Sequence, residues 1–452
     1  MPISPVSQSN WLTKQEVTDK LSEHIKGKSY SHLTQVQQDV LQQRMRTVEK
    51  WGRFNFYGDP REDIDGFLKS IDEMITSIGS PIETPDLPAL GPMVSKMYGL
   101  FFKTIPTFNE IWSEKKLFRH LFLEQNPKLM SEGRDLLKTL LKEIFAQLQS
   151  ADIPINIASA EGLVGNILAL YPFLDPQNAE KIEVPIYDNN RWTMGEYTIE
   201  SVQLTPSWMG SPVISYGLIP SGNLPPLMLF KGTSYPSDNG FFLQLLTDFN
   251  PFGSVGSYLF NICKGNIEKW LDNSAKTAKR NARLYGVSLG GALTEHTVVE
   301  YPYLIEKVYA FNAPALLGFE LTNWTKSWKK SKGVGMPEVN VYCQDNDLVS
   351  NLGIKWGKGW NVYKVFGPLK SQSMLLGHLR CFLADKESMM LKMDRGLESN
   401  QKVRWVLTIL HQLVSIPFFM LGSLVWLVHI GLQHLEPFLL NFFNDNDDQK
   451  SS

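Results

Sequence analysis

The chain has 452 residues, in which 44 lysines and arginines nearly balance 46 aspartates and glutamates. Its length allows two or three domains, and its balanced charge excludes the strong positive field that draws proteins onto nucleic acid. The three cysteines, Cys263, Cys343 and Cys381, are too widely spaced for a zinc site and too few to staple a fold of this size. We therefore expect reduced thiols, no metal or other cofactor, and no nucleic-acid partner.

The first part of the chain, residues 1–150, is expected to form a helical N-terminal region. Apolar residues recur at spacings of three and four in residues 16–25, 33–51 and 132–149, while the proline-rich residues 79–92 predict a loop. This region holds no catalytic constellation, so we expect a helical cap or an interaction domain with an unidentified protein partner. The opening residues lack the apolar run of a secretory signal peptide, so export by that route is not expected.

The sequence pattern changes near Pro154, where short apolar runs begin. Runs such as PVISYGLIP and PPLMLFKGT predict strands, and similar runs alternate with helical segments as far as NVYKVFG at residues 361–367. This alternation favours βαβ units and a mostly parallel sheet. An α/β domain is therefore expected over residues 151–400.

A serine between glycines lies in this domain, in the segment YGVSLGGAL. Gly286, Ser288 and Gly290 match the G-x-S-x-G pattern, in which the serine stands on a sharp turn between a strand and a helix. The structural alternative is an ordinary turn, because glycine and serine are common turn residues. A serine hydroxyl at its usual pKa is a poor nucleophile, so catalysis also requires a base and an acid that orients it.

The predicted α/β domain contains two histidines. His296 lies two helical turns beyond Ser288 on a helix that leads away, so we expect a structural role for it and take His378 as the candidate base. Asp345 and Asp347 follow a predicted strand, at the sheet edge where α/β sites gather. Asp347 is preferred and Asp345 is the alternative, and both are turn formers if the serine is not catalytic. The order serine, aspartate, histidine is that of α/β-hydrolases.

Acyl transfer also requires N–H donors that face the developing oxyanion. The Leu289 amide directly follows the candidate nucleophile. Gly232 allows a sharp turn after a strand, which presents the Thr233 amide, and the Thr233 hydroxyl is able to brace the hole. Thr233 and Leu289 are therefore the candidate oxyanion-hole residues.

Five segments, LFKGTS, YGVSLGGAL, YAFNAPALLG, QDNDLVSNLG and GHL, resemble in that order the class 3 lipases, the fungal-type branch of the α/β-hydrolases. The resemblance covers about residues 225–382. It implies an α/β-hydrolase core with Ser288 as nucleophile, Asp347 as acid and His378 as base, and the two amides named above as the oxyanion hole.

The resemblance also implies a mobile lid over residues 235–260. Its apolar residues would shield the site in water, although they are equally consistent with ordinary core: Phe241, Phe242, Leu245 and Phe249. The chain departs from the family pattern at Val287, Asn312 and Ser350, where the family has histidine, glycine and proline. These departures indicate a remote branch with its own specificity.

The C-terminal segment, residues 401–452, contains an apolar run at residues 413–432 that is long enough to cross a bilayer core of about 30 Å. Three residues disturb this run: Pro417, Gly422 and His429. A hairpin in one leaflet and a buried helical pair packed on the hydrolase domain are therefore alternatives to a span. Basic residues precede the run, so a spanning helix would keep the hydrolase domain in the cytoplasm.

Together these features predict a serine hydrolase, a lipase or phospholipase that cleaves lipid carboxylic esters through an acyl-enzyme on Ser288 at a membrane surface. One alternative is a catalytically inactive lipase-like scaffold that binds lipid or a protein partner. Another is a membrane-bound hydrolase of non-lipid thioesters or peptides.

Overall fold

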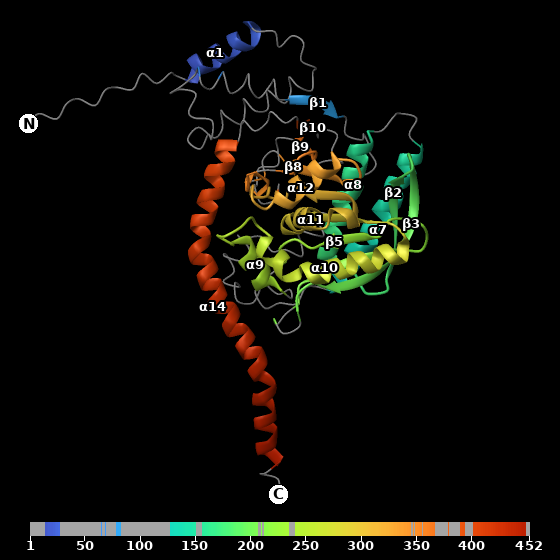
Figure 1. The fold of residues 1–452 in the computed structure, drawn as a ribbon, viewed down its shortest axis with the longest axis vertical. Helices are drawn as coiled ribbons and strands as arrows, with labels where there is room; N and C mark the ends of the chain where they lie inside the picture. The colour runs from blue at the N-terminus through green and yellow to red at the C-terminus, as the bar shows by residue number, and fades with distance from the viewer. Residues whose placement is uncertain are drawn as a thin grey trace, which may run out of the picture.

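A computed structural model describes residues 14–27, 78–82, 127–150, 156–206, 212–234, 240–344, 349–354, 356–366, 389–393 and 401–448, together with residues 65, 68, 209, 347 and 378. Ten strands in these residues form one sheet, in the order β1-β10-β9-β8-β7-β6-β5-β4-β3-β2 (Figure 1). Helices cover both faces of the sheet, which makes the architecture α/β.

The centre of the sheet is parallel, as the alternation of strands and helices predicts. Its five strands follow one another in space as in sequence: β5 (Leu227–Phe230), β6 (Ala282–Val287), β7 (Ile305–Phe311), β8 (Glu338–Gln344) and β9 (Asn361–Phe366). The intervening helices are α9 (Phe241–Asp248), α10 (Ser257–Ala278), α11 (Leu289–Glu300) and α12 (Thr322–Ser331). The carboxyl ends of the five strands therefore meet at one edge of the sheet.

The outer strands are antiparallel, so the expectation of a mostly parallel sheet is wrong and the sheet is mixed. These strands are β2 (Lys181–Asp188), β3 (Arg191–Gln203) and β4 (Ile214–Pro220) on one side, with β10 (Met389–Met393) and β1 (Ile78–Ile82) on the other. Asn189 and Asn190, with φ of 48° and 62°, form the tight turn between β2 and β3. Strand β1 also occupies the start of the predicted loop at residues 79–92.

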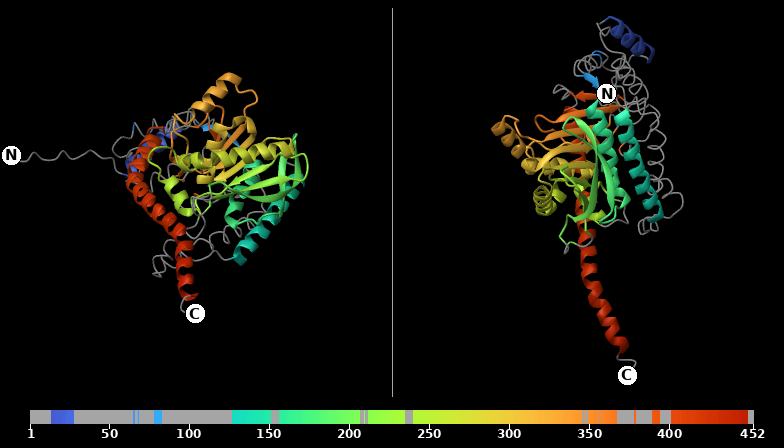
Figure 2. Two further views of the ribbon diagram at one scale, coloured as in Figure 1. Left: turned by 60° about the horizontal axis from the view of Figure 1, so that its bottom comes forward. Right: turned by 90° about the vertical axis from the view of Figure 1, so that its right-hand side faces the viewer.

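Two helical layers enclose the sheet (Figure 2). On one face, α7 (Pro127–Ser150) and α8 (Ile157–Leu170) pack against aromatic side chains of the central strands, including the stacked rings of Tyr285 and Tyr309. On the other, α9 to α12 cover residues such as Leu284 and Val308. Because neighbouring residues in a strand point to opposite faces, the buried strands present an apolar side to each layer.

Helix α7 belongs to the sheet domain, since its fully buried residues Leu137, Leu140 and Ile144 lie in the same core as β2 and β3. The expected boundary near residue 150 thus falls between two helices that cover one face. The predicted helix at residues 16–25 is confirmed by α1 (Lys14–Gly27), and the prediction for residues 33–51 lies outside the described residues.

An ion-pair network ties the amino ends of β6 and β7 to the β2–β3 hairpin. Arg283 is 2% exposed, and its guanidinium contacts Glu306 Oε1 at 2.6 Å and donates to the Tyr187 carbonyl at 3.0 Å. Arg280 contacts Asp188 at 2.8 Å and Glu306 Oε2 at 2.7 Å. This network lies at the opposite end of β6 from Ser288.

The C-terminal segment forms one long helix, α14 (Gln401–Asp448), which Pro417 does not end. Two helical windows in the described residues are long and apolar enough to cross a membrane. The window from Ile157 to Leu174 is 83% buried and is the core helix α8 with the turn that follows it. The window from Arg404 to Val428 lies in α14 and is 11% buried, so the alternative of a buried helical pair is wrong.

Candidate active site

Ser288 stands on a strained turn between β6 and α11, with φ of 58° and ψ of −126°. Such a conformation is rare for a residue with a side chain and is typical of a nucleophile elbow. The glycines on either side of Ser288 are required because a Cβ at their positions would collide with neighbouring backbone atoms. A Cβ on Gly286 would lie 2.2 Å from the Gly290 carbonyl oxygen, and one on Gly290 would lie 2.3 Å from the Phe230 carbonyl oxygen. The predicted strand–serine–helix arrangement is therefore present.

Asp347 follows β8 and has a side chain that is only 1% exposed. His378 Nδ1 donates to Asp347 Oδ1 across 2.9 Å. The backbone N–H groups of Val349 and Ser350 also donate to this carboxylate, each at 3.0 Å. The buried carboxylate thus fixes one ring nitrogen of His378 and leaves Nε2 free for a second partner. The alternative acid, Asp345, lies outside the described residues.

Ser288 and His378 are both described, and no hydrogen bond joins them in this structure. Catalytic hydrogen bonds are often long without substrate and shorten only when it binds. The histidine is 12% exposed, and its carbonyl accepts a hydrogen bond from the side-chain amide of Asn312 at 2.7 Å. The structure therefore joins the candidate acid and the candidate base directly, and brings the serine to the same sheet edge at the end of β6, two strands away from β8.

Asn312 is a site residue that the sequence did not single out for a role. It follows β7 with φ of 48°, and its side-chain oxygen accepts from the Gln344 amide at 2.8 Å. It thereby links the ends of β7 and β8 to His378. An asparagine directly after a buried strand was the available signal, because asparagine tolerates the left-handed conformation.

The two candidate oxyanion-hole residues flank Ser288. Leu289 is the first residue of α11, so its N–H has no acceptor within the helix and is available to an anion. A Cβ on Gly232 would lie 2.9 Å from the Val287 carbonyl oxygen and 3.6 Å from Ser288 Cβ, which places the turn before Thr233 beside the elbow. This close approach requires glycine.

A further carboxylate, Asp248 at the end of α9, also belongs to this site. Thr233 Oγ1 donates to Asp248 Oδ2 at 2.6 Å, which joins the turn of this candidate oxyanion-hole residue to the end of α9. Burial raises the pKa of Asp248 to about 7, against the opposing effects of the Thr233 hydrogen bond and the nearby His378. No local sequence pattern points to this residue, because the contact depends on how α9 folds back over the turn.

Asp248→Asn is expected to stabilise the protein at pH 8. The charged form of Asp248 is disfavoured in the fold, so its contribution to stability is complete below about pH 4 and is lost as the pH rises through 7. Asparagine keeps an oxygen for Thr233 and cannot ionise. Urea unfolding should show a gain of roughly 2–4 kcal/mol at pH 8 and little change at pH 4. Equal or lower stability of the variant at pH 8 would contradict this assignment.

Helix α9 lies where the lipase resemblance implies a lid. Leu243 and Leu246 are buried in the core, whereas Phe241, Leu245 and Phe249 are partly exposed, and the side chain of Phe242 lies outside the described residues. The segment is thus a helix packed by one face over the sheet edge that carries Ser288. The buried residues of α9 are consistent with ordinary core, and its partly exposed residues are consistent with a shield over the site.

His296 has the structural role expected from sequence. Its Nε2 lies 3.0 Å from Ser254 Oγ, and its ring stacks on Phe260 with centroids 5.5 Å apart. Cys263 and Cys343 are free and buried, and burial raises the pKa of each thiol to about 12. Cys381 lies outside the described residues. Across the described part of the chain, no group of three or more histidine, cysteine or acidic side chains is arranged to hold a metal ion.

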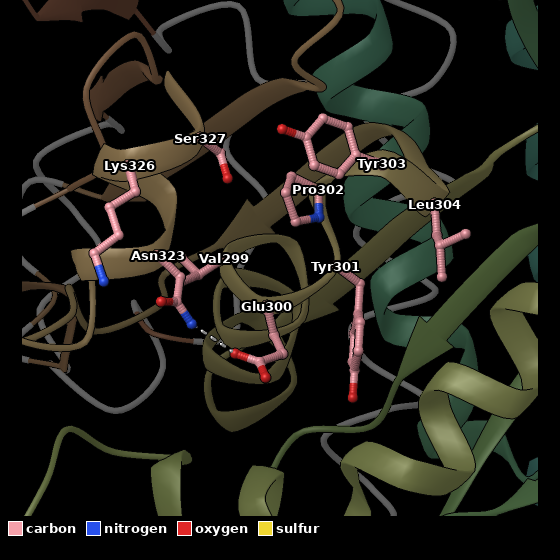
Figure 3. Close-up of a pocket in the computed structure, with 9 residues that line it drawn as sticks. All are labelled: Val299, Glu300, Tyr301, Pro302, Tyr303, Leu304, Asn323, Lys326 and Ser327. Atoms are coloured by element: carbon pink, nitrogen blue, oxygen red, sulfur yellow. Dashed lines mark hydrogen bonds between the residues drawn. The ribbon is translucent and has the colours of Figure 1, made fainter. Parts of the chain in front are cut away.

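A surface pocket lies at the far end of α11 from Ser288 (Figure 3). Tyr301, Tyr303 and Lys326 line it, and Asn323 donates a hydrogen bond to Glu300 across it at 3.2 Å. Val299, the pocket residue of α11 nearest to the elbow, lies about 17 Å along the helix axis from Ser288. The pocket is therefore distinct from the site of Ser288.

No protein-family model matches the chain, and no curated protein matches it. Among solved structures, that of a triacylglycerol lipase from Penicillium expansum is similar over 44% of this chain and 74% of the lipase chain, with 14% sequence identity and a TM-score of 0.28. So remote a likeness assigns neither a reaction nor a substrate, which must come from the chain's own residues.

Proposed function

We propose that this protein is a serine hydrolase that cleaves carboxylic ester bonds of lipids. One observation carries the proposal: Ser288 occupies a strained strand-to-helix turn, and a hydrogen-bonded His378–Asp347 pair lies at the same sheet edge. A backbone strain of this kind is retained where function requires it. The apolar side chains of α9 beside this edge favour a lipid substrate.

In the proposed reaction, Ser288 Oγ attacks the ester carbonyl carbon and passes its proton to His378 Nε2. The tetrahedral oxyanion accepts hydrogen bonds from the Thr233 and Leu289 amides. The alcohol leaves with the proton from His378, which yields an acyl-enzyme on Ser288. Water then attacks the acyl carbon with His378 as general base, and the released fatty acid restores the serine. Asp347 holds the ring in the required tautomer throughout.

Fluorophosphonate labelling tests this proposal directly. The wild type should react, and mass spectrometry should place the label on Ser288, because an activated serine attacks the phosphorus. Ser288→Ala should not react, and Ser254→Ala serves as the matched control because Ser254 bonds to His296. A folded wild type that stays unlabelled in the presence of detergent would favour the inactive scaffold.

A substrate panel separates lipid esters from the other hydrolysable classes. Wild type should hydrolyse a short-chain chromogenic ester and long-chain glycerides or phospholipids. Activity confined to thioesters or to amides would exclude the lipid ester proposal while retaining Ser288 as nucleophile.

A further inference from the structure

Helix α14 packs on the protein by one side and exposes the opposite side. On the packed side, Arg404 donates to the Ser350 carbonyl at 2.8 Å, and Thr408 Oγ1 accepts from the Gly353 amide at 3.0 Å. These contacts attach the start of α14 to the loop of Asp347.

Further along, the packed side lies against the lid-like segment around α9. The ring of Phe249 stacks on His411 and Phe418, with centroids 6.1 and 5.2 Å away. A Cβ on Gly422 would lie 2.7 Å from Leu246 Cδ2, so the two helices approach closely. Trp426 packs against the same core as α9. Figures 1 and 2 show α14 passing beside α9.

The opposite side of α14 is exposed and almost wholly apolar. No aspartate, glutamate, lysine or arginine occurs from Trp405 to Leu435. Thirteen large apolar side chains between residues 405 and 428 are at least 39% exposed. Phe418 is one of them and lies on the packed side, and the other twelve form the exposed face: Trp405, Val406, Ile409, Leu410, Leu413, Val414, Ile416, Met420, Leu421, Leu424, Leu427 and Val428. Phe252, 80% exposed, continues this surface from the loop after α9.

The contacts between α14 and the domain disfavour a helix that crosses a membrane over this stretch. Contacts with the domain run from Arg404 to Trp426, about 33 Å along the helix axis. A spanning helix needs acyl chains around it over a core of about 30 Å. The same stretch cannot be surrounded by acyl chains and packed against a charged, water-exposed domain. An interfacial helix needs lipid on one side only.

The width of the exposed face favours lipid over a second helix. Exposed neighbours such as Ile409 and Leu410 lie about 100° apart around the axis, and this arrangement repeats at Leu413 and Val414 and again at Met420 and Leu421. A partner helix buries a narrow seam of one or two rows. A bilayer surface covers a broad apolar arc.

We propose that this exposed face of α14 binds the surface of a lipid bilayer, with the helix axis in the plane of the membrane. Docking of this kind holds α9, which packs on the opposite side of α14, about one helix diameter, roughly 10 Å, from the bilayer. A role of this proximity in lipid hydrolysis rests on the proposed function, whereas the docking itself does not. The cytoplasmic location expected from charge bias presupposes a span and does not extend to a helix that stays on one side.

Sedimentation with dioleoylphosphatidylcholine vesicles tests the docking. Leu413→Glu/Leu424→Glu, at side chains 59% and 60% exposed, should lower the partition coefficient of the full chain by at least about 100-fold. The matched control Phe319→Glu/Val334→Glu, at side chains 65% and 80% exposed outside α14, should bind like wild type. Because the face lacks charge, wild-type binding should persist in 0.5 M NaCl.

Two outcomes would overturn the proposal. The first is that the wild type fails to bind these vesicles and is a dimer in light-scattering measurements, whereas the Leu413→Glu/Leu424→Glu variant is a monomer. The exposed face of α14 would then be an interface between two copies of the chain. The second is a C-terminal epitope tag that resists protease on intact vesicles, since an in-plane helix leaves both ends outside. Fluorophosphonate labelling of the same preparations shows separately whether the hydrolase proposal holds.

Discussion

Ser288→Ala and His378→Ala are each expected to lower kcat/KM for a soluble ester by about 10⁵- to 10⁶-fold, and the double variant should be no slower than either. Residues that act as one unit lose their effect together, because a base without a nucleophile, or a nucleophile without a base, does nothing. If the two residues contributed independently, the fold losses in kcat/KM of the two single variants would multiply in the double variant. The comparison therefore tests whether the serine and histidine cooperate, although no hydrogen bond joins them in the structure.

The acid can be assigned in the same assay. Asp347→Asn should cost about 10³- to 10⁴-fold, because an amide stabilises the wrong tautomer of His378 and cannot offset the positive charge on its ring. Asp345→Asn should leave the rate nearly unchanged. Circular dichroism and urea unfolding would show that each variant is folded. The opposite ranking of the two aspartates would transfer the role to Asp345.

Arg283→Met is expected to destabilise the fold by about 3–5 kcal/mol. The guanidinium is 2% exposed and contacts Glu306 at 2.6 Å, with Asp188 at 3.6 Å and Glu161 at 3.9 Å. Methionine fills similar space but leaves these carboxylates with less positive charge, and desolvation already raises the pKa of Glu161. The urea unfolding midpoint at pH 7 would measure the loss.

A surface ion pair provides the control for this prediction. Lys181 contacts Glu196 at 2.9 Å, but the two side chains are 67% and 48% exposed. Lys181→Met should therefore change the free energy of unfolding by less than about 1 kcal/mol. A similar small effect for Arg283→Met would mean that water or rearrangement compensates the buried charges.

The central part of the fold was predictable because its signals are local. Strands β5 to β9 are short apolar runs bounded by turn residues, and the elbow needs only glycines at fixed offsets around Ser288. The antiparallel strands β2 and β3 were missed, although the Asn189–Asn190 pair is a typical signal for a tight hairpin. These strands precede the α/β alternation, so the pattern that predicts the central strands does not include them.

Other features depend on contacts between distant segments and carry no local signal. The position of Asp248 against Thr233, and of Asn312 against His378, follows from how loops return to the sheet edge. The apolar run in α14 could be recognised, but not its one-sided packing on α9. A sequence shows how apolar a helix is, whereas its buried side depends on the partner that the fold provides.

During synthesis, strand β1 leaves the ribosome long before β10, the strand with which it pairs. Ile78 pairs with Met393, 315 positions later in the chain. A ribosome that adds roughly 5–20 residues per second therefore synthesises the partner strand about 15–60 s after β1. During that interval the early strand has no ladder to join, and an unpaired strand is a template for other chains. Chaperone capture of nascent chains should therefore concentrate on this amino-terminal strand.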